Sequence, residues 1–124
     1  MSRRVLVADD EPNIVVALEF LLQRNGYEVH VARNGEEALR LVETCNPDLV
    51  LLDVMMPLRS GYEVCKRIKA RPEWGHIKIV MLSAKGRDAE VSKGLALGAD
   101  LYLTKPFSTR ELLDKIKGLL AEQG

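Results

Sequence analysis

Reactive side chains stand directly after short apolar runs in this sequence of 124 residues. Asp9 and Asp10 follow the first run, Asp53 the third, Ser83 the fourth and Lys105 the fifth. Three carboxylates brought together would repel one another and destabilise the fold, so a positive partner must join them. Carboxylates, a cation, a hydroxyl and a Lys ammonium group together suit phosphoryl transfer, in which catalysis consists mainly of positioning and charge neutralisation.

A hard divalent cation is the natural partner of such carboxylates. Oxygen ligands favour Mg²⁺, with Mn²⁺ as the alternative. Residues 9–13 lack the Asp/Asn alternation, the Gly and the distant Glu of a twelve-residue calcium loop, so Ca²⁺ is the weaker assignment. On this interpretation Asp53 attacks phosphorus and becomes an aspartyl phosphate. Lys105 and the cation offset the negative oxygens, while Ser83 donates a hydrogen bond to one of them.

The elements that position these residues follow from the apolar pattern. Short runs rich in Val, Leu and Ile alternate with longer stretches of helical spacing, which is typical of βαβ units. Residues 49–52 and 79–82 are apolar throughout, as in parallel strands covered on both faces. The pattern predicts strands at Arg4–Ala8, Glu28–Ala32, Leu49–Leu52, Ile77–Leu82 and Leu101–Thr104, and helices at Pro12–Asn25, Gly35–Cys45, Gly61–Ala70, Ala89–Leu97 and Thr109–Glu122.

Capping signals support the helix boundaries. Asn34, Ser60 and Ser108 each precede a Glu by three positions, which predicts reciprocal capping boxes. Gly26 and Gly98 each follow a predicted helix, where a residue in the left-handed region can close the last turn.

Five right-handed βα units predict a single α/β domain over residues 1–124. The expected architecture is a three-layer (βα)5 sandwich around a five-stranded parallel sheet in the flavodoxin-like order 2-1-3-4-5. All strands then end at one edge, where the reactive side chains meet. The second strand ends in Ala32-Arg33-Asn34, which offers nothing obviously reactive and suits a position at the border of the sheet.

Composition excludes several classes of protein. The sequence has 18 basic and 18 acidic residues, so no bulk attraction to nucleic acid or to a membrane surface is expected. Cys45 and Cys65 form no C-x-x-C motif and are interpreted as core-facing thiols, while His30 and His76 are interpreted as structural or surface residues. Because the sequence shows no long apolar segment and no signal peptide, a cytoplasmic location is expected.

The reactive residues also lie in motifs that resemble a known family. In order and spacing they are similar to those of the receiver domain of bacterial response regulators, and the similarity covers nearly the whole chain. Each motif alone is weak, whereas the set is highly specific. The matching motifs are Asp9-Asp10, Leu51-Leu52-Asp53-Val54-Met55-Met56-Pro57 followed by Gly61, Ser83-Ala84, and Lys105-Pro106.

The resemblance implies a phosphoacceptor and a metal site. Asp53 would accept the phosphoryl group from a phosphohistidine of a sensor histidine kinase or a histidine phosphotransfer protein. Mg²⁺ would be bound by Asp10, by Asp53 and by the backbone carbonyl of Met55, with Asp9 assisting through water.

The resemblance also implies a switch and an output surface. Ser83 and Tyr102 would form the switch pair, in which the hydroxyl moves toward the phosphate and the aromatic ring turns inward. The output surface would comprise the last two helices and the last strand, roughly Ala89–Glu122, and a homodimer formed there on phosphorylation is left open. The bond between Lys105 and Pro106 would be cis. The sequence is compatible with a stand-alone regulator and with the receiver part of a longer protein.

Two other functions share parts of this pattern. A small phosphohydrolase could also use an aspartyl phosphate, but the Asp-x-Asp motif of haloacid-dehalogenase-like phosphatases is absent, since Val54 and Met55 follow Asp53. A flavodoxin-type electron carrier would share the fold. Its phosphate-binding loop should offer Gly and hydroxyl groups, whereas the first loop here, residues 9–12, is acidic. The acidic pair alone is equally consistent with favourable charge at a helix start.

Overall fold

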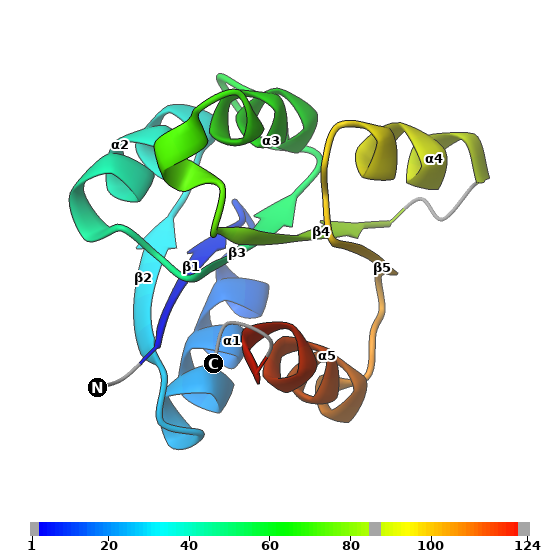
Figure 1. Cartoon of the computed structure of the whole chain (residues 1–124). Coiled ribbons are helices and arrows are strands. Elements are labelled where there is room, and N and C mark those ends of the chain that lie inside the picture. The colour runs from blue at the N-terminus through cyan, green and yellow to red at the C-terminus, as the bar shows by residue number, and fades with distance from the viewer. Residues whose placement is uncertain (1–2, 85–87, 122–124) are drawn as a thin grey trace.

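The computed structural model describes residues 3–84 and 88–121, which form a parallel sheet in the order β2-β1-β3-β4-β5 with helices on both faces (Figure 1). This confirms the predicted fold class and strand order. The strands are β1 (Arg4–Ala8), β2 (Glu28–Ala32), β3 (Leu49–Asp53), β4 (Lys78–Ser83) and β5 (Leu101–Thr104). The helices are α1 (Pro12–Arg24), α2 (Gly35–Cys45), α3 (Gly61–Lys69), the 3₁₀ helix η1 (Pro72–Trp74), α4 (Asp88–Ala96) and α5 (Thr109–Ala121).

Two apolar cores hold the layers together. Helices α1 and α5 cover one face of the sheet, and α2, α3 and α4 cover the other (Figure 1). Side chains alternate along each strand, so on β1 Val5 and Val7 pack toward α1 and α5 while Leu6 and Ala8 pack toward α2 and α3. Strand β3 is buried at every position, whereas β2 at the border is half-exposed over much of its length. The central strands therefore supply a fixed base for the residues at their carboxyl ends.

The strands reach further than the apolar pattern predicts. β3 includes Asp53 and β4 includes Ser83, so each of these residues is the last of its strand rather than the first of a loop. Leu82 pairs with Asp53 across the two strands, and the N–H of Val54 donates to the carbonyl of Leu82 at 3.0 Å. Backbone pairing thus fixes both residues at one edge of the sheet.

The predicted caps are confirmed on their acceptor side. Asn34 Oδ1 accepts from the N–H of Glu37 at 2.8 Å, Ser60 Oγ accepts from the N–H of Glu63, and Ser108 Oγ accepts from the N–H of Glu111, the last two at 3.2 Å. Gly26 and Gly98 have positive φ of 87° and 106°, as predicted. Asn46, after α2, also lies in the left-handed region, at φ 46°.

The predicted reciprocal contact, in which the glutamate accepts from the N–H of the cap residue, is wrong for Glu37 and Glu63. The carboxylate of Glu37 accepts from the N–H of Arg33, one residue before the cap, at 3.1 Å. The carboxylate of Glu63 instead accepts from the guanidinium of Arg59 at 2.7 Å, and Arg59 also pairs with Glu36 on α2. A charged guanidinium is a stronger donor than a backbone amide, so the glutamate binds it in preference. The pair between Arg59 and Glu36 ties the loop after β3 to α2.

Gly61 begins α3 where that helix approaches the end of β3 most closely. Its N–H donates to the carbonyl of Val54 at 2.9 Å. A Cβ at this position would lie 2.3 Å from the carbonyl oxygen of Asp53, far inside van der Waals contact. The absence of a side chain is therefore what lets α3 return directly onto the strand that carries Asp53.

We expect Gly61→Ala to lower the free energy of unfolding by about 2–3 kcal/mol, because the added methyl group meets backbone that cannot move without disturbing β3. Gly118 on α5 is the matched control, since it is exposed and has nothing within 4 Å of an added Cβ. Gly118→Ala should raise the free energy of unfolding by about 0.5–1 kcal/mol. Urea denaturation followed by circular dichroism measures both, and equal effects at the two positions would contradict the packing argument.

Candidate functional site

Side chains from three strand ends converge around one ammonium group. Lys105 follows β5, and its Nζ lies 3.1 Å from Asp9 Oδ2 after β1 and 3.5 Å from Asp53 Oδ1 at the end of β3. A third carboxylate, Glu11, lies 3.0 Å from the same nitrogen. The sequence predicted that Asp9, Asp53 and Lys105 would meet, and they do. It did not assign Glu11, although that residue continues the same acidic run.

The aspartates form a pocket with the ligand chemistry of a hard cation. Carboxylate oxygens of Asp9, Asp10 and Asp53 all lie within 4.8 Å of one another. Asp9 and Asp53 are 0% and 5% exposed, while Asp10 faces solvent. Oxygen donors alone, with one side open to water, fit a partly hydrated Mg²⁺ or Mn²⁺. The three predicted metal-binding aspartates are thus brought together.

Local backbone geometry holds the acidic turn in place. The N–H of Asp9 donates to the carbonyl of Ala32 at 3.1 Å, which keeps it aligned with β2. Asp9 Oδ1 accepts from the N–H of Glu11 at 2.9 Å, so one of its oxygens is held by the turn and the other faces Lys105. Pro12 then starts α1, with no N–H to leave unsatisfied.

The surroundings of Asp53 make its ionised form costly. Burial, followed by the charge of Asp9, raises the pKa of Asp53 to about 7. Lys105 and the N–H of Met55, which lies 3.4 Å from Asp53 Oδ1, act in the opposite direction but do not cancel the rise. One ammonium group does not fully neutralise this pocket. A divalent cation would supply the missing positive charge.

Lys105 keeps its charge in spite of its position. Burial by itself favours the neutral amine, but hydrogen bonds to Glu11 and Asp9 and the charge of Asp53 outweigh burial, and the pKa of Lys105 is raised. The ammonium form is therefore secured in the pocket. The peptide bond between Lys105 and Pro106 is cis, as the resemblance implied.

Ser83 lies at the same edge as Lys105. It is 2% exposed and ends β4, and its carbonyl accepts from the N–H of Lys105 at 2.6 Å. Since Leu82 pairs with Asp53, the next residue of β4 stands beside the end of β3. The predicted hydroxyl is therefore at the edge where it was expected.

Tyr102 on β5 packs against Gly94 of α4 and is hydrogen-bonded to Tyr62 of α3, a residue that the sequence did not single out. A Cβ on Gly94 of α4 would lie 3.0 Å from Tyr102 Cδ2, so the glycine makes room for the ring. Tyr62 on α3 contacts the same helix, because its hydroxyl donates to the carbonyl of Glu90 at 3.4 Å and Lys93 Nζ lies 4.4 Å from its ring centre. Burial, followed by a hydrogen bond with Tyr102, raises the pKa of Tyr62 to about 12. No sequence pattern marks Tyr62 for this contact.

A buried aspartate beside a lysine and two further carboxylates, at the carboxyl edge of a 2-1-3-4-5 parallel sheet, defines a phosphoacceptor class of α/β domain. The chain belongs to the response regulator receiver domain family, whose model matches residues 5–117. It is therefore a receiver domain of two-component signalling, with a phosphoacceptor role.

Individual relatives support the family assignment. The chain is 47% identical over 120 residues to the alkaline phosphatase synthesis transcriptional regulatory protein PhoP of Bacillus subtilis (strain 168), an alignment that covers 97% of this chain and 49% of PhoP. The chain thus spans about half the length of this curated relative.

Solved structures agree with the same assignment. A chain described as a response regulator from Chloroflexus aurantiacus J-10-fl has a TM-score of 0.92 at 37% identity, covering 98% of this chain and 99% of its own. A CheY-like receiver domain from Methanospirillum hungatei JF-1 has a TM-score of 0.90 at 33% identity, covering 99% of this chain and 97% of its own.

Within the described residues, no helix is long and apolar enough to span a membrane.

In metal-free protein above neutral pH, we expect Asp53→Asn to raise the free energy of unfolding by about 1–3 kcal/mol, because it removes a charge that the pocket stabilises poorly. The folded-state pKa of about 7 lies above that of an unfolded Asp. Wild-type stability therefore falls as pH rises from about 4 to about 7. The advantage of the variant should grow over that window and vanish near pH 4.

Urea denaturation across this pH range, with a chelator present, measures the difference. Asp114→Asn on the exposed face of α5 is the control and should change stability little at any pH. A variant at position 53 that is no more stable than wild type at pH 8 would contradict the electrostatic account.

Proposed function

We propose that Asp53 is the phosphoacceptor and that it takes the phosphoryl group from a phosphohistidine on a sensor histidine kinase or a histidine phosphotransfer protein. The observation that carries this assignment is the position of Lys105 Nζ, 3.5 Å from Asp53 Oδ1 and 3.1 Å from Asp9 Oδ2. Asp53 is the buried carboxylate at the end of the central strand, with an ammonium group already beside it.

In the proposed reaction Asp53 attacks phosphorus, an O–P bond forms, and the P–N bond to the donor histidine breaks. Lys105 holds its charge against the negative oxygens of the transferred group, and the hydroxyl of Ser83 donates a hydrogen bond to one of them. The N–H of Met55, already directed at Asp53, keeps the attacking carboxylate in place.

Mg²⁺ is the proposed cofactor, with Mn²⁺ as a substitute. Asp10, Asp53 and the backbone carbonyl of Met55 would hold it, and Asp9 would assist through water. When bound it supplies the positive charge that keeps Asp53 ionised and neutralises the phosphoryl oxygens. The oxygen-only donor set and the raised pKa of Asp53 both support this choice.

The proposed output passes through Ser83 and Tyr102. Phosphorylation adds charge and acceptor oxygens, which would draw the Ser83 hydroxyl toward Asp53 and bias a pre-existing arrangement of Tyr102. The ring already contacts Gly94, so α4 is the element that would respond. The α4-β5-α5 face, roughly Ala89–Glu122, is the proposed docking surface for an output partner or domain, or for a second copy of this chain; Glu122 lies outside the described residues.

The proposed domain extends over residues 1–124. Its own residues would promote both the transfer of the phosphoryl group to Asp53 and the slow hydrolysis of the resulting acyl phosphate. This makes the chain a signalling switch, in contrast to a phosphohydrolase that turns over small esters. One phosphoryl group per chain, without release of many equivalents of phosphate, distinguishes the switch from the hydrolase.

Incubation with acetyl phosphate and Mg²⁺ should add one phosphoryl group per chain, detected by intact-protein mass spectrometry. Asp53→Asn should remove this labelling because the nucleophile is gone, and a chelator should suppress it in the wild type. Asp114→Asn is the matched control, with the same chemical change on an exposed helix face. Undiminished labelling of the variant at position 53 would overturn the acceptor assignment.

Lys105→Gln should slow labelling of Asp53 by about 100-fold, the usual loss when one donor to a developing negative charge is removed. Circular dichroism with Mg²⁺ present checks that the variant is folded. Lys117→Gln, on the exposed face of α5, should label at the wild-type rate. A wild-type rate for Lys105→Gln would show that its ammonium group takes no part in the transfer.

A further inference from the structure

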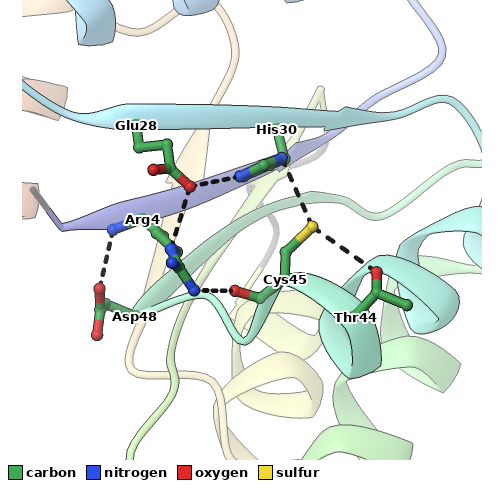
Figure 2. Close-up of polar contacts among 6 residues, drawn as sticks. All are labelled: Arg4, Glu28, His30, Thr44, Cys45 and Asp48. Atoms are coloured by element: carbon green, nitrogen blue, oxygen red, sulfur yellow. Dashed lines mark hydrogen bonds and ion pairs between the residues drawn. The ribbon is translucent and has the colours of Figure 1, made fainter.

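A second polar cluster lies at the other edge of the sheet, where the strands begin. Helix α2 runs back across the sheet, so its last residue, Cys45, meets the first residues of β1 and β2. The sequence predicted a core-facing thiol at this position and a structural or surface role for His30. The structure instead brings the two side chains together. Figure 2 shows the cluster, which comprises Arg4, Glu28, His30, Thr44, Cys45 and Asp48.

The thiol of Cys45, the imidazole of His30 and the carboxylate of Glu28 form a chain of successive contacts. Cys45 Sγ is 3.5 Å from His30 Nδ1, and His30 Nε2 is 2.8 Å from Glu28 Oε2 (Figure 2). Each ring nitrogen therefore has one partner. A carboxylate on one nitrogen fixes the orientation of the ring and leaves the other nitrogen free to take a proton from the thiol. Nucleophile, base and orienting acid, in that order, form the arrangement that activates a nucleophile.

The arrangement does not fit a metal site or ordinary core packing. Among the described residues, the group of three with the spacing of metal ligands is the aspartate pocket, not this cluster. Cys65 shows what a core thiol looks like here: it is fully buried, and burial raises its pKa to about 11. Cys45, by contrast, is only partly buried.

The charged groups around Cys45 favour a reactive thiol. Arg4 Nη1 donates to the carbonyl of Cys45 at 2.9 Å, and Arg4 Nε pairs with Glu28 Oε2 at 3.1 Å. Asp48 accepts from the backbone N–H of Arg4, and Thr44 Oγ1 lies 3.7 Å from the sulfur. The guanidinium thus offsets the negative end of α2 at the residue that carries the thiol.

We propose that Cys45 is a nucleophilic thiol, assisted by His30 and oriented through Glu28, and that it is a site of modification by hydrogen peroxide. His30 Nδ1 takes the thiol proton, and the sulfur attacks one oxygen of the peroxide. An S–O bond forms while the O–O bond breaks, and the leaving hydroxide takes the proton from His30 and departs as water. The thiol is oxidised to a sulfenic acid and the peroxide is reduced to water.

The test measures the rate at which Cys45 of the folded protein forms a sulfenic acid in hydrogen peroxide, trapped with dimedone and located by peptide mass spectrometry. His30→Gln should lower this rate at least about tenfold, because the proton acceptor is lost. Glu28→Gln, which keeps the hydrogen-bonding shape but removes the charge, should lower it less. Asp114→Asn, on the exposed face of α5, should leave it unchanged.

Two comparisons separate base assistance from simple exposure. At pH 7, iodoacetamide should alkylate Cys45 faster in the folded wild type than in folded His30→Gln, whereas the two proteins should react alike when unfolded in urea. Cys45 in the folded wild type should also react faster than the same residue in the unfolded chain, a comparison that does not depend on the folding of any variant. Equal rates for folded wild type and His30→Gln, or a folded rate no faster than the unfolded one, would refute the proposal.

Discussion

The structure depends on two buried carboxylates that share one ammonium group. Asp9 and Asp53 are removed from water at neighbouring strand ends, and Lys105 is the cation that contacts both. Because burial and mutual repulsion still raise the pKa of Asp53 to about 7, the pocket is left short of positive charge. That shortage is the physical basis for binding a divalent cation, and it places an electrostatic cost on the folded protein whenever the cation is absent.

The rest of the fold holds the charged side chains in place by keeping the strand ends rigid. β3 and β4 are buried along nearly their whole length, so the positions of Asp53 and Ser83 are set by backbone pairing rather than by loop conformation. Gly61 lets α3 pack directly over Asp53, and the ion pairs of Arg59 with Glu36 and Glu63 fasten the intervening loop to α2 and α3. A pocket built from such elements can hold charges in unfavourable contact without rearranging.

The sequence predicts the features that depend on periodicity and on strand direction. Apolar runs that end in Asp, Ser or Lys place those residues at one edge once the sheet is parallel, and no side-chain detail is needed to bring Asp9, Asp53 and Lys105 together. The approach of Tyr62 to α4 is different in kind. It depends on how far α3 lies from α4 and on the room left by Gly94, and such distances arise from packing between elements that periodicity treats separately.

The cluster around Cys45 is a second example of contacts that periodicity does not predict. Cys45 and His30 are fifteen positions apart and belong to a helix and a strand of opposite direction, so their contact depends on where α2 stops. Glu28 and His30 share the face of β2 that α2 covers, and polar residues there stand out once the strand is known to be at the border of the sheet. In the register of the sheet Glu28 pairs with Arg4 and His30 with the fully buried Leu6, so the polar pair lies beside the first residues of β1. The two edges of a parallel sheet thus carry different side chains. The sequence interpretation considered only the residues at the carboxyl ends of the strands, so it did not identify the contact between Cys45 and His30 at the opposite edge.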